Sequence, residues 1–377
     1  MLHAHLSFKI LYYLLIFFLS CSVITNTSAI SQHTVPQPIF SSTIYVNWNN
    51  TQGPWDGSLE HPFQRIQDGI NNAKDNDTVY VFSGLYYEHV RVNKTITLQG
   101  EDKNTTIIDA NYSSTCVFLV SGNVHINGFT IQHSGTNDDN DAGVGILNLG
   151  HQSHGNIIEG NIMQYNYYGV FNWASDSNII SNNIIRNNND GIYFQAYDTN
   201  TIIINNSIIN NGNGIRIYED NSYNNVLSSN IIDNNTVYGI LMCGYNCTIT
   251  SNHISRSKNG VTVLGYHTNI QRNNITQNNI GLEMVLTIQS SVKENSFINN
   301  LRDATFTYVI MQRVMLPFIL YPQITKWHAN YWDKYLIGPK IIHGKMNPSI
   351  WFNIGIPWLN FDFSPAKNPY PDNTGGG

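Results

Sequence analysis

Short apolar segments alternate with polar turns through the middle of the chain, and this alternation repeats. Each repeat contains a glycine followed by an apolar residue, and these glycines lie 21 to 25 residues apart. Apolar runs such as those in Asn178–Ile185 and Gly191–Phe194 are bounded by Asn, Ser and Gly. Short apolar runs between turn-forming residues predict β-strands. The repeating glycines are Gly145, Gly169, Gly191, Gly214, Gly239, Gly260 and Gly281.

Two columns of mostly asparagine keep the same period. Their members are 21 to 24 residues apart, and the second column lies five residues after the first. A period near 22 residues is too short for two packed helices and fits one coil of a parallel β-helix. We therefore expect an all-β solenoid with about 22 residues per coil. The columns are Asn161, Asn183, Asn206, Asn230, Asn252, Asn274 and Asn295, and then Asn166, Asn188, Asn211, Asn235, Ser257, Asn279 and Asn300.

The composition supports this fold and excludes other classes. The chain has 377 residues, a net charge of −6, only 12% charged residues and 54 Asn. A nucleic-acid binder would need an excess of basic residues, and 19 Lys and Arg face 25 Asp and Glu. Stacked amides can hydrogen-bond from coil to coil, whereas stacked identical charges repel. The excess of Asn and the scarcity of charge thus have one cause.

Side chains alternate between the two faces of a strand, so the residues after each glycine can be assigned to a face. The first and third residues after the glycine are almost all apolar and are expected to face the core. The second and fourth residues then face outward. On three successive coils they present aromatic rings beside Arg216, which suits the apolar faces and hydroxyls of sugars. The predicted substrate-binding residues are Phe171, Trp173, Tyr193, Tyr197, Arg216, Tyr218 and Glu219.

Three aspartates at similar distances from their glycines are candidate catalytic residues. Asp176, Asp198 and Asp220 should stack on successive coils, about 5 Å or 10 Å apart. These separations are close to those between the two carboxylates of glycosidases. The alternative is that each aspartate caps the turn before the next strand, as Asp often does.

A second acidic cluster is a candidate calcium site. Asp138, Asp139 and Asp141 lie in a loop where the coil is longer than its neighbours, close to His133. Clustered carboxylate oxygens are ligands that Ca²⁺ prefers. A solvated acidic loop is the alternative.

The ends of the chain differ from the repeats. Residues 1–29 have a short basic start and an apolar run from Ile10 to Leu19, which predicts a secretory signal peptide. An uncleaved membrane anchor and a lipid-modified Cys21 are the alternatives. We expect an N-terminal cap with the first coils in 30–110, repeats in 111–303, and an aromatic capping segment with a flexible tail in 304–377.

Local patterns add detail to the expected caps. Helical spacing from Pro62 to Ala73 predicts an amphipathic helix over one end of the solenoid. We expect no membrane span after the leader. Cys243 and Cys247 could pair in an exported protein.

The residues also resemble a known family, the right-handed parallel β-helix surface proteins of archaea, which are related to the NosD-like and carbohydrate-binding groups of the pectin-lyase-like fold. The resemblance rests on the coils and on both ends of the chain. It implies a right-handed solenoid at the cell surface or secreted. The end segments are Ile66–Ala73, Asp77–Val81, Gly84–Glu88, Gly100–Asp109, Asn330–Asp333 and Trp358–Lys367.

Two chemistries are implied by the resemblance alone. Uronate lyases of this fold use Ca²⁺ and a Lys or Arg base, but Arg216 is the only basic residue at the outward positions considered. The NosD-like group implies copper handling, and copper sites cluster Met, His and Cys. Met242, Cys243 and Cys247 are close in sequence, but Met242 is expected in the core. His151 and His154 are expected in a solvated loop.

The leading expectation is an exported protein that binds polysaccharide or another glycan through its outward aromatic face. A polysaccharide hydrolase, lyase or epimerase is the first alternative. A structural or adhesive surface protein and a metal-handling protein are the others.

Overall fold

The computed structural model describes most of the second of two compact units, residues 41–377. The described residues are 41–136, 141–147, 153–218, 221–309, 325–334, 338–347 and 356–371. The expected leader and the predicted site residues Asp138, Asp139, Glu219 and Asp220 lie outside them, as does His151. No helix among the described residues is long and apolar enough to cross a membrane.

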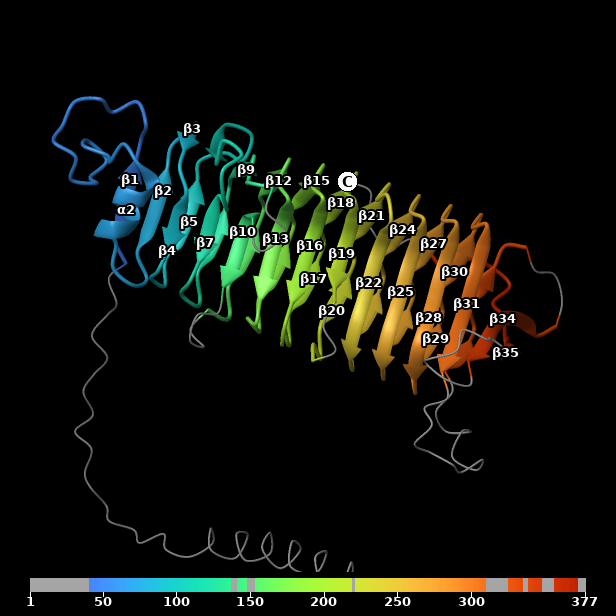
Figure 1. Cartoon of the computed structure of the whole chain (residues 1–377). Coiled ribbons are helices and arrows are strands. Elements are labelled where there is room, and N and C mark those ends of the chain that lie inside the picture. The colour runs from blue at the N-terminus through green and yellow to red at the C-terminus, as the bar shows by residue number, and fades with distance from the viewer. Residues whose placement is uncertain are drawn as a thin grey trace, which may run out of the picture. The chain divides into compact units, whose positions relative to one another are not determined.

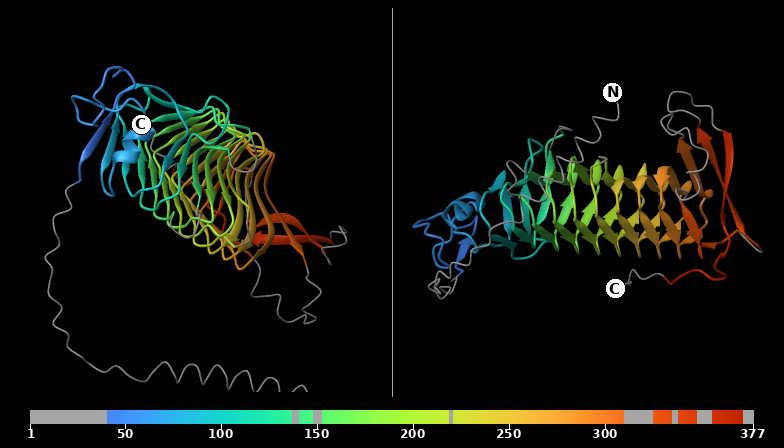
Figure 2. Two further views of the ribbon diagram at one scale, coloured as in Figure 1. Left: turned by 60° about the vertical axis from the view of Figure 1, so that its left-hand side comes forward. Right: turned by 90° about the horizontal axis from the view of Figure 1, so that it is seen from below.

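The expected right-handed parallel β-helix is confirmed. Each coil contributes one strand to each of three faces, and corresponding strands pair in parallel, with one coil on the next (Figures 1 and 2). Val170, Ile192 and Ile215 pair in register at steps of 22 and 23 residues. The measured register therefore reproduces the period of the sequence.

The strands of each face follow in chain order. The long-strand face contains β4 (Val90–Val92), β7 (Val117–Leu119), β10 (Ala142–Leu147), β13 (Tyr168–Trp173), β16 (Asp190–Gln195), β19 (Asn213–Ile217), β22 (Tyr238–Tyr245), β25 (Asn259–Tyr266), β28 (Ile280–Ile288), β31 (Arg302–Val309) and β34 (Lys340–Asn347). The second face contains β1 (Thr43–Val46), β2 (Thr78–Val81), β5 (Thr97–Gly100), β8 (His125–Asn127), β11 (Ile157–Glu159), β14 (Ile179–Ser181), β17 (Ile202–Ile204), β20 (Val226–Ser228), β23 (Thr248–Thr250), β26 (Asn269–Gln271), β29 (Ser291–Lys293) and β32 (Lys326–His328). The third face contains β3 (Gly84–Tyr87), β6 (Thr106–Asp109), β9 (Thr130–Gln132), β12 (Ile162–Gln164), β15 (Ile184–Arg186), β18 (Ser207–Ile209), β21 (Ile231–Asp233), β24 (His253–Ser255), β27 (Asn274–Thr276), β30 (Ser296–Ile298) and β33 (Tyr331–Trp332).

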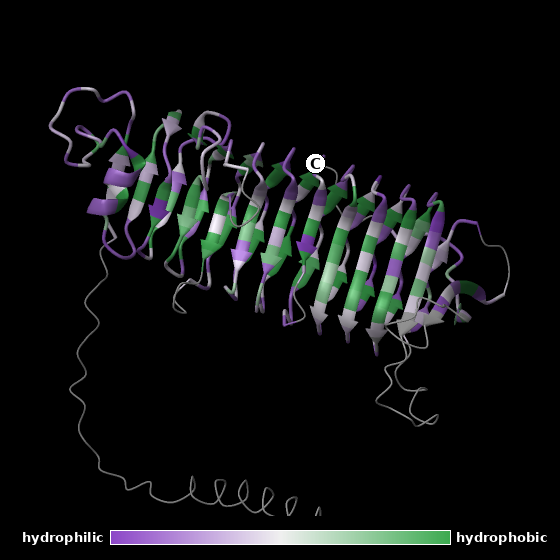
Figure 3. Ribbon diagram, in the orientation of Figure 1, coloured by the Kyte–Doolittle hydropathy of each residue, from purple (hydrophilic) through white to green (hydrophobic). Residues whose placement is uncertain are grey.

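The interior of the solenoid is a single apolar core. The first and third residues after the repeating glycines are buried, as Ile192 and Phe194 illustrate. Apolar and polar positions alternate along the strands in Figure 3, which follows from the alternation of side chains between the two faces of a strand. Gly143, rather than Gly145, begins the repeat on β10, because Val144 pairs with Val170.

Buried asparagines form ladders at two corners of every regular coil. In the first ladder, Asn206 Nδ2 donates to Asn230 Oδ1 at 3.0 Å and to the Ile180 carbonyl at 2.8 Å. Its own Oδ1 accepts the backbone N–H of Asn183 at 3.0 Å. Each amide thus satisfies backbone groups that the turn leaves unpaired inside the solenoid.

The ladders continue to the last coils. In each predicted column, one asparagine differs from the one that the structure places in the ladder. Asn273, not Asn274, follows Asn252 in the first ladder. Asn278, not Asn279, follows Ser257 in the second. Each error lies within an Asn-Asn pair, where only the observed strand register shows which amide turns inward.

Both ends of the solenoid are covered. The short helix α2 (Ile66–Asn72) packs on β1, β2 and β4, and Ile66 and Ile70 are fully buried. Glu88 accepts the N–H groups of Ile66 and Gln67, so a carboxylate satisfies the first turn of the helix. At the other end, β34 pairs antiparallel with β35 (Ile356–Asp362), which ends the parallel repeat.

Removing one amide from a ladder should strongly destabilise the fold. We expect Asn206→Ala to lower the free energy of unfolding by about 3 kcal/mol or more, because at least two buried polar groups lose their partners at about 1–3 kcal/mol each. Asn189→Ala, at an exposed position, is the control and should change stability by less than about 0.5 kcal/mol. Chemical denaturation of the two variants measures both values, and equal losses would contradict a supporting role for the ladder.

Candidate functional site

Six side chains form a regular array on the outer surface of β13, β16 and β19. The paired strands place them in two columns of three, one residue per coil in each column. Successive coils lie about 4.8 Å apart, and the columns are separated by two residues along each strand. We call this array the outer grid. Its inner column is Phe171, Tyr193 and Arg216, and its outer column is Trp173, Gln195 and Tyr218.

The inner column faces away from the core, as expected, yet its rings are buried. Phe171 and Tyr193 pack with Tyr168 and Ala142 in a cluster separate from the main core. The Tyr168 ring lies 5.4 Å from Phe171 and 4.9 Å from Tyr193. These rings therefore form an aromatic floor rather than exposed contact surfaces.

A buried ion pair fixes Arg216 on this floor. The guanidinium lies 3.9 Å from the centre of the Tyr193 ring. Its Nε and Nη2 donate to Asp190 Oδ2 at 2.6 Å and 2.5 Å, and Asn213 Nδ2 donates to Asp190 Oδ1 at 2.5 Å. Burial raises the pKa of Asp190 above its ordinary value, and Arg216 opposes this shift. Asp190 is fully buried, whereas the Arg216 side chain keeps 24% of its surface exposed.

The outer column remains open to solvent. Trp173 and Tyr218 are 38% and 56% exposed and lie two coils apart, about 9.5 Å along the axis, with half-buried Gln195 between them. Tyr197, in the turn after β16, is 64% exposed. Exposed rings thus flank an amide and a fixed guanidinium. This arrangement can hold a ligand with apolar faces and hydroxyl groups.

The three predicted catalytic aspartates are in different environments. Asp198 is fully buried, and its Oδ1 accepts Asn172 Nδ2 at 2.5 Å and the Ser175 N–H at 3.3 Å. Asp176 is half-buried on the preceding coil, and Asp220 lies outside the described residues. The contacts of Asp198 stabilise the turn after β13, which corresponds to the turn-capping alternative. Catalysis by the three aspartates remains a prediction.

The proposed calcium loop is described only at Asp141. This residue is buried and lies against Gly135, where a larger residue would clash with its carboxylate. Calcium binding therefore also remains a prediction.

A cavity of about 1070 Å³ opens between β31 and β34, far along the chain from the outer grid. Lys340 Nζ lies 3.2 Å from Asp303 Oδ2 and 5.1 Å from the Trp332 ring centre. Burial raises the pKa of Asp303, and Lys340 opposes the shift. The ion pair connects the terminal hairpin to the last coil of the long-strand face.

Sequence reasoning did not find two residues of the site, Asp190 and Tyr168. Both come directly before a repeating glycine. The sequence analysis assigned only the residues after each glycine to the core or to the solvent, so it did not consider this position. Their own column contains Asn213 and Asn259 on later coils. The same column also contains Ala142, Tyr238 and Ile280, so it has no consensus residue, and the sequence pattern alone did not single out Asp190 or Tyr168.

Comparison with known proteins agrees with the fold. The family model described as "Periplasmic copper-binding protein (NosD)" matches residues 70–245 and 217–336, which together cover 267 of the 377 residues. No curated protein matches the sequence.

Three solved structures with the same fold illustrate the similarity, each at low sequence identity to this chain. The complex of XylC with xylose has 12% identity and a TM-score of 0.56, covering 71% of this chain and 75% of that one. The A-module of the Azotobacter vinelandii mannuronan C-5 epimerase AlgE6 has 14% identity and a TM-score of 0.50, covering 81% and 91%. ORF18 of Geobacillus virus E2 has 13% identity and a TM-score of 0.50, covering 85% and 63%. At these identities the likeness shows the fold alone.

The described residues do not provide a copper site. Within the described ranges, no three His, Cys, Asp or Glu side chains gather as a metal site would require. Met242 lies in the core, and no disulfide joins Cys243 to Cys247 among the described cysteines. Burial raises the pKa of the Cys247 thiol to about 11.

Breaking the buried ion pair should destabilise the outer grid in a pH-dependent way. We expect Arg216→Met to lower the free energy of unfolding at pH 7 by about 3 kcal/mol, the low end for a buried pair because Arg216 is partly exposed. The unpaired Asp190 should then have a still higher pKa. Lowering the pH protonates it, so the loss of stability should shrink toward pH 4.

Arg256→Met is the matched control, because Arg256 pairs with Asp233 on an exposed part of the third face. It should have little effect on stability. Urea unfolding at pH 4 and pH 7 tests both variants. A loss for Arg216→Met that is independent of pH would contradict a buried, charged Asp190.

Proposed function

Because the chain belongs to the NosD family of parallel β-helix proteins, we propose that it is an exported protein that binds glycan chains on its long-strand face. The family description is periplasmic, and the sequence of residues 1–29 is typical of a secretory signal peptide. Export to the cell surface, as in the archaeal proteins that the sequence resembles, is part of this proposal.

The observation that carries the proposal is the fixed polar group between exposed rings. Asp190 and the Tyr193 ring hold Arg216 in one orientation, so little side-chain freedom is lost when a ligand binds. Trp173 and Tyr218 offer apolar ring surface that is already exposed. A sugar has C–H faces for such rings and hydroxyl groups for the guanidinium and for Gln195.

The spacing and the relatives also support a glycan. The two exposed rings of the outer column lie two coils apart, about 9.5 Å along the axis, so an extended chain of sugar units can contact an aromatic ring more than once. Two of the structural neighbours are a complex with xylose and a mannuronan C-5 epimerase. Since Asp198 is engaged in a turn, binding rather than hydrolysis is the function that the described geometry supports best.

Removing either exposed ring should weaken glycan binding. We expect Trp173→Ala and Tyr218→Ala each to raise the Kd for the bound oligosaccharide about tenfold, equivalent to about 1.4 kcal/mol. Both side chains project outward, so the fold should be retained. Isothermal titration calorimetry with a panel of neutral and uronate hexasaccharides measures the change.

Trp358→Ala is the control, since Trp358 is similarly exposed but lies on β35 in the terminal hairpin. Its Kd should match that of the wild-type protein. Wild-type affinity in both outer-column variants would refute binding at this grid.

A further inference from the structure

One turn of every regular coil places a residue in the left-handed backbone region. This turn joins the third face to the long-strand face, and asparagine is common in it because Asn tolerates this conformation. Four coils place another residue there, and two neighbouring coils of these carry rings, His133 and Tyr165, at φ values of 58° and 57°. His, like Asn, is enriched in this region, whereas a Tyr is strained there, and such strain concentrates at functional sites. The column is His133, Tyr165, Asn187, Asn210, Asn234, Arg256, Gln277 and Asn299.

Both rings belong to a stack of three, which we call the corner stack. Tyr112, also left-handed at φ 60°, lies 4.4 Å from His133, and His133 lies 5.8 Å from Tyr165, measured between ring centres. The interplanar angles are 28° and 29°. Tyr112 and Tyr165 are nevertheless 61% and 50% exposed. The stack therefore exposes much aromatic surface that could contact a ligand.

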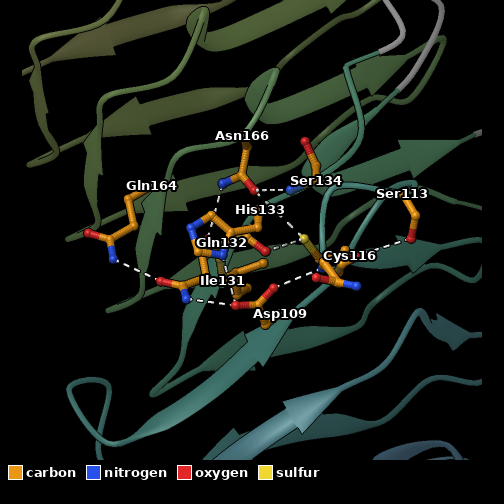
Figure 4. A network of polar contacts seen from close by, with 11 residues as sticks. Asp109, Ser113, Cys116, Ile131, Gln132, His133, Ser134, Gln164 and Asn166 are labelled. Atoms are coloured by element: carbon orange, nitrogen blue, oxygen red, sulfur yellow. Dashed lines mark hydrogen bonds and ion pairs between the residues drawn. The ribbon is translucent and has the colours of Figure 1, made fainter.

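A buried carboxylate orients the central ring of the stack. His133 Nδ1 lies 2.8 Å from Asp109 Oδ2, and Gln132 Nε2 donates to the same oxygen at 2.8 Å (Figure 4). Burial raises the pKa of Asp109, but the hydrogen bonds from Gln132, the Asn111 N–H and His133 outweigh this and hold the pKa below its usual value. An ionised Asp109 accepts a hydrogen bond from Nδ1, and this bond orients the ring.

Beside the stack, side chains from successive strands of the third face form an amide ladder, Asp109–Gln132–Gln164–Arg186. Gln164 Nε2 donates to Gln132 Oε1 at 3.0 Å, and Arg186 donates to Gln164 Oε1 at 3.0 Å and 2.9 Å. The carboxylate at one end and the guanidinium at the other fix the direction of both amides. Gln132 and Gln164 each keep one N–H, Arg186 keeps three, and Gln132 Oε1 keeps a lone pair.

The corner stack adjoins the aromatic floor of the outer grid. Tyr167 follows Tyr165 by two residues, and its ring contacts Tyr168 edge-on at 4.8 Å. The charges of Asp109 and Arg186 balance, so the amide ladder as a whole carries no net charge. The corner thus offers exposed rings, mixed donors and acceptors, and electrical neutrality.

We propose that the corner stack and the amide ladder extend the glycan-binding surface around this corner and select an uncharged glycan. The inference rests on the proposed function and adds the class of substrate. Hydroxyl groups of a neutral sugar both donate and accept, which matches the remaining N–H groups and acceptors. A uronate or a phosphate would bring a charge for which the balanced ladder has no spare counterpart.

Substitutions at the left-handed turn position separate an effect on binding from an effect on stability. Tyr165→Asn and His133→Asn introduce the residue that other coils use at this position, so both variants should fold. Tyr165→Asn should have a Tm equal to or above that of the wild type, whereas His133→Asn also loses the hydrogen bond to Asp109. Each should weaken binding of neutral hexasaccharides at least tenfold in isothermal titration calorimetry with xylohexaose, cellohexaose and mannohexaose. Gln277→Asn introduces the same residue into the same column, five coils beyond Tyr165, and should leave binding unaltered.

Hexamannuronate and Trp173→Ala complete the experiment. Wild-type affinity in both Tyr165→Asn and His133→Asn would overturn the corner surface, and a loss in Trp173→Ala would then leave the grid proposal intact. Tighter binding of hexamannuronate than of every neutral hexasaccharide would overturn the substrate class. If the wild-type protein bound none of these oligosaccharides, the inference and the proposed function would both fail.

Discussion

The structure depends on one constraint: the coils must align at the two asparagine corners so that side-chain amides can pair from coil to coil. A turn that enters the solenoid interior leaves backbone groups without partners, and the Asn amides pair with them and with each other. Because the pairing runs between coils, an interior residue such as Asn206 is supported from both sides. The same requirement excludes repeated charges and accounts for a chain with 12% charged residues and 54 Asn.

The constraint also determines where function can arise. Positions inside the ladders and the core are committed to packing, so variation is concentrated on the outward positions and in the left-handed turn. Surface side chains with specific contacts gather on neighbouring coils. Asp190 and Arg216 form an ion pair on the long-strand face, and His133 and Tyr165 stack in the left-handed turn. Binding surfaces in solenoids commonly have this origin.

The sequence predicted the fold well because the periodic signal is repeated many times, and an error in one coil leaves the others unaffected. The assignment failed locally where two asparagines are adjacent, as at Asn273 and Asn274, since spacing alone does not show which one points inward. Burial was also misjudged on the long-strand face. Phe171 and Tyr193 do point outward, but they cover each other, an effect that depends on neighbouring coils. The corner stack was missed because left-handed backbone leaves no mark in the pattern of apolar residues.

The account's central claim is that the exposed rings of the outer grid and of the corner stack are the glycan contact surface. Hydroxyl-radical footprinting of the full chain, with and without neutral hexasaccharides, tests this directly because it reports the exposure of each ring. The account predicts lower oxidation of Tyr165, Trp173 and Tyr218 when oligosaccharide is present, and unchanged oxidation of Trp358. Unchanged oxidation of all three rings, or protection of Trp358 alone, would contradict it.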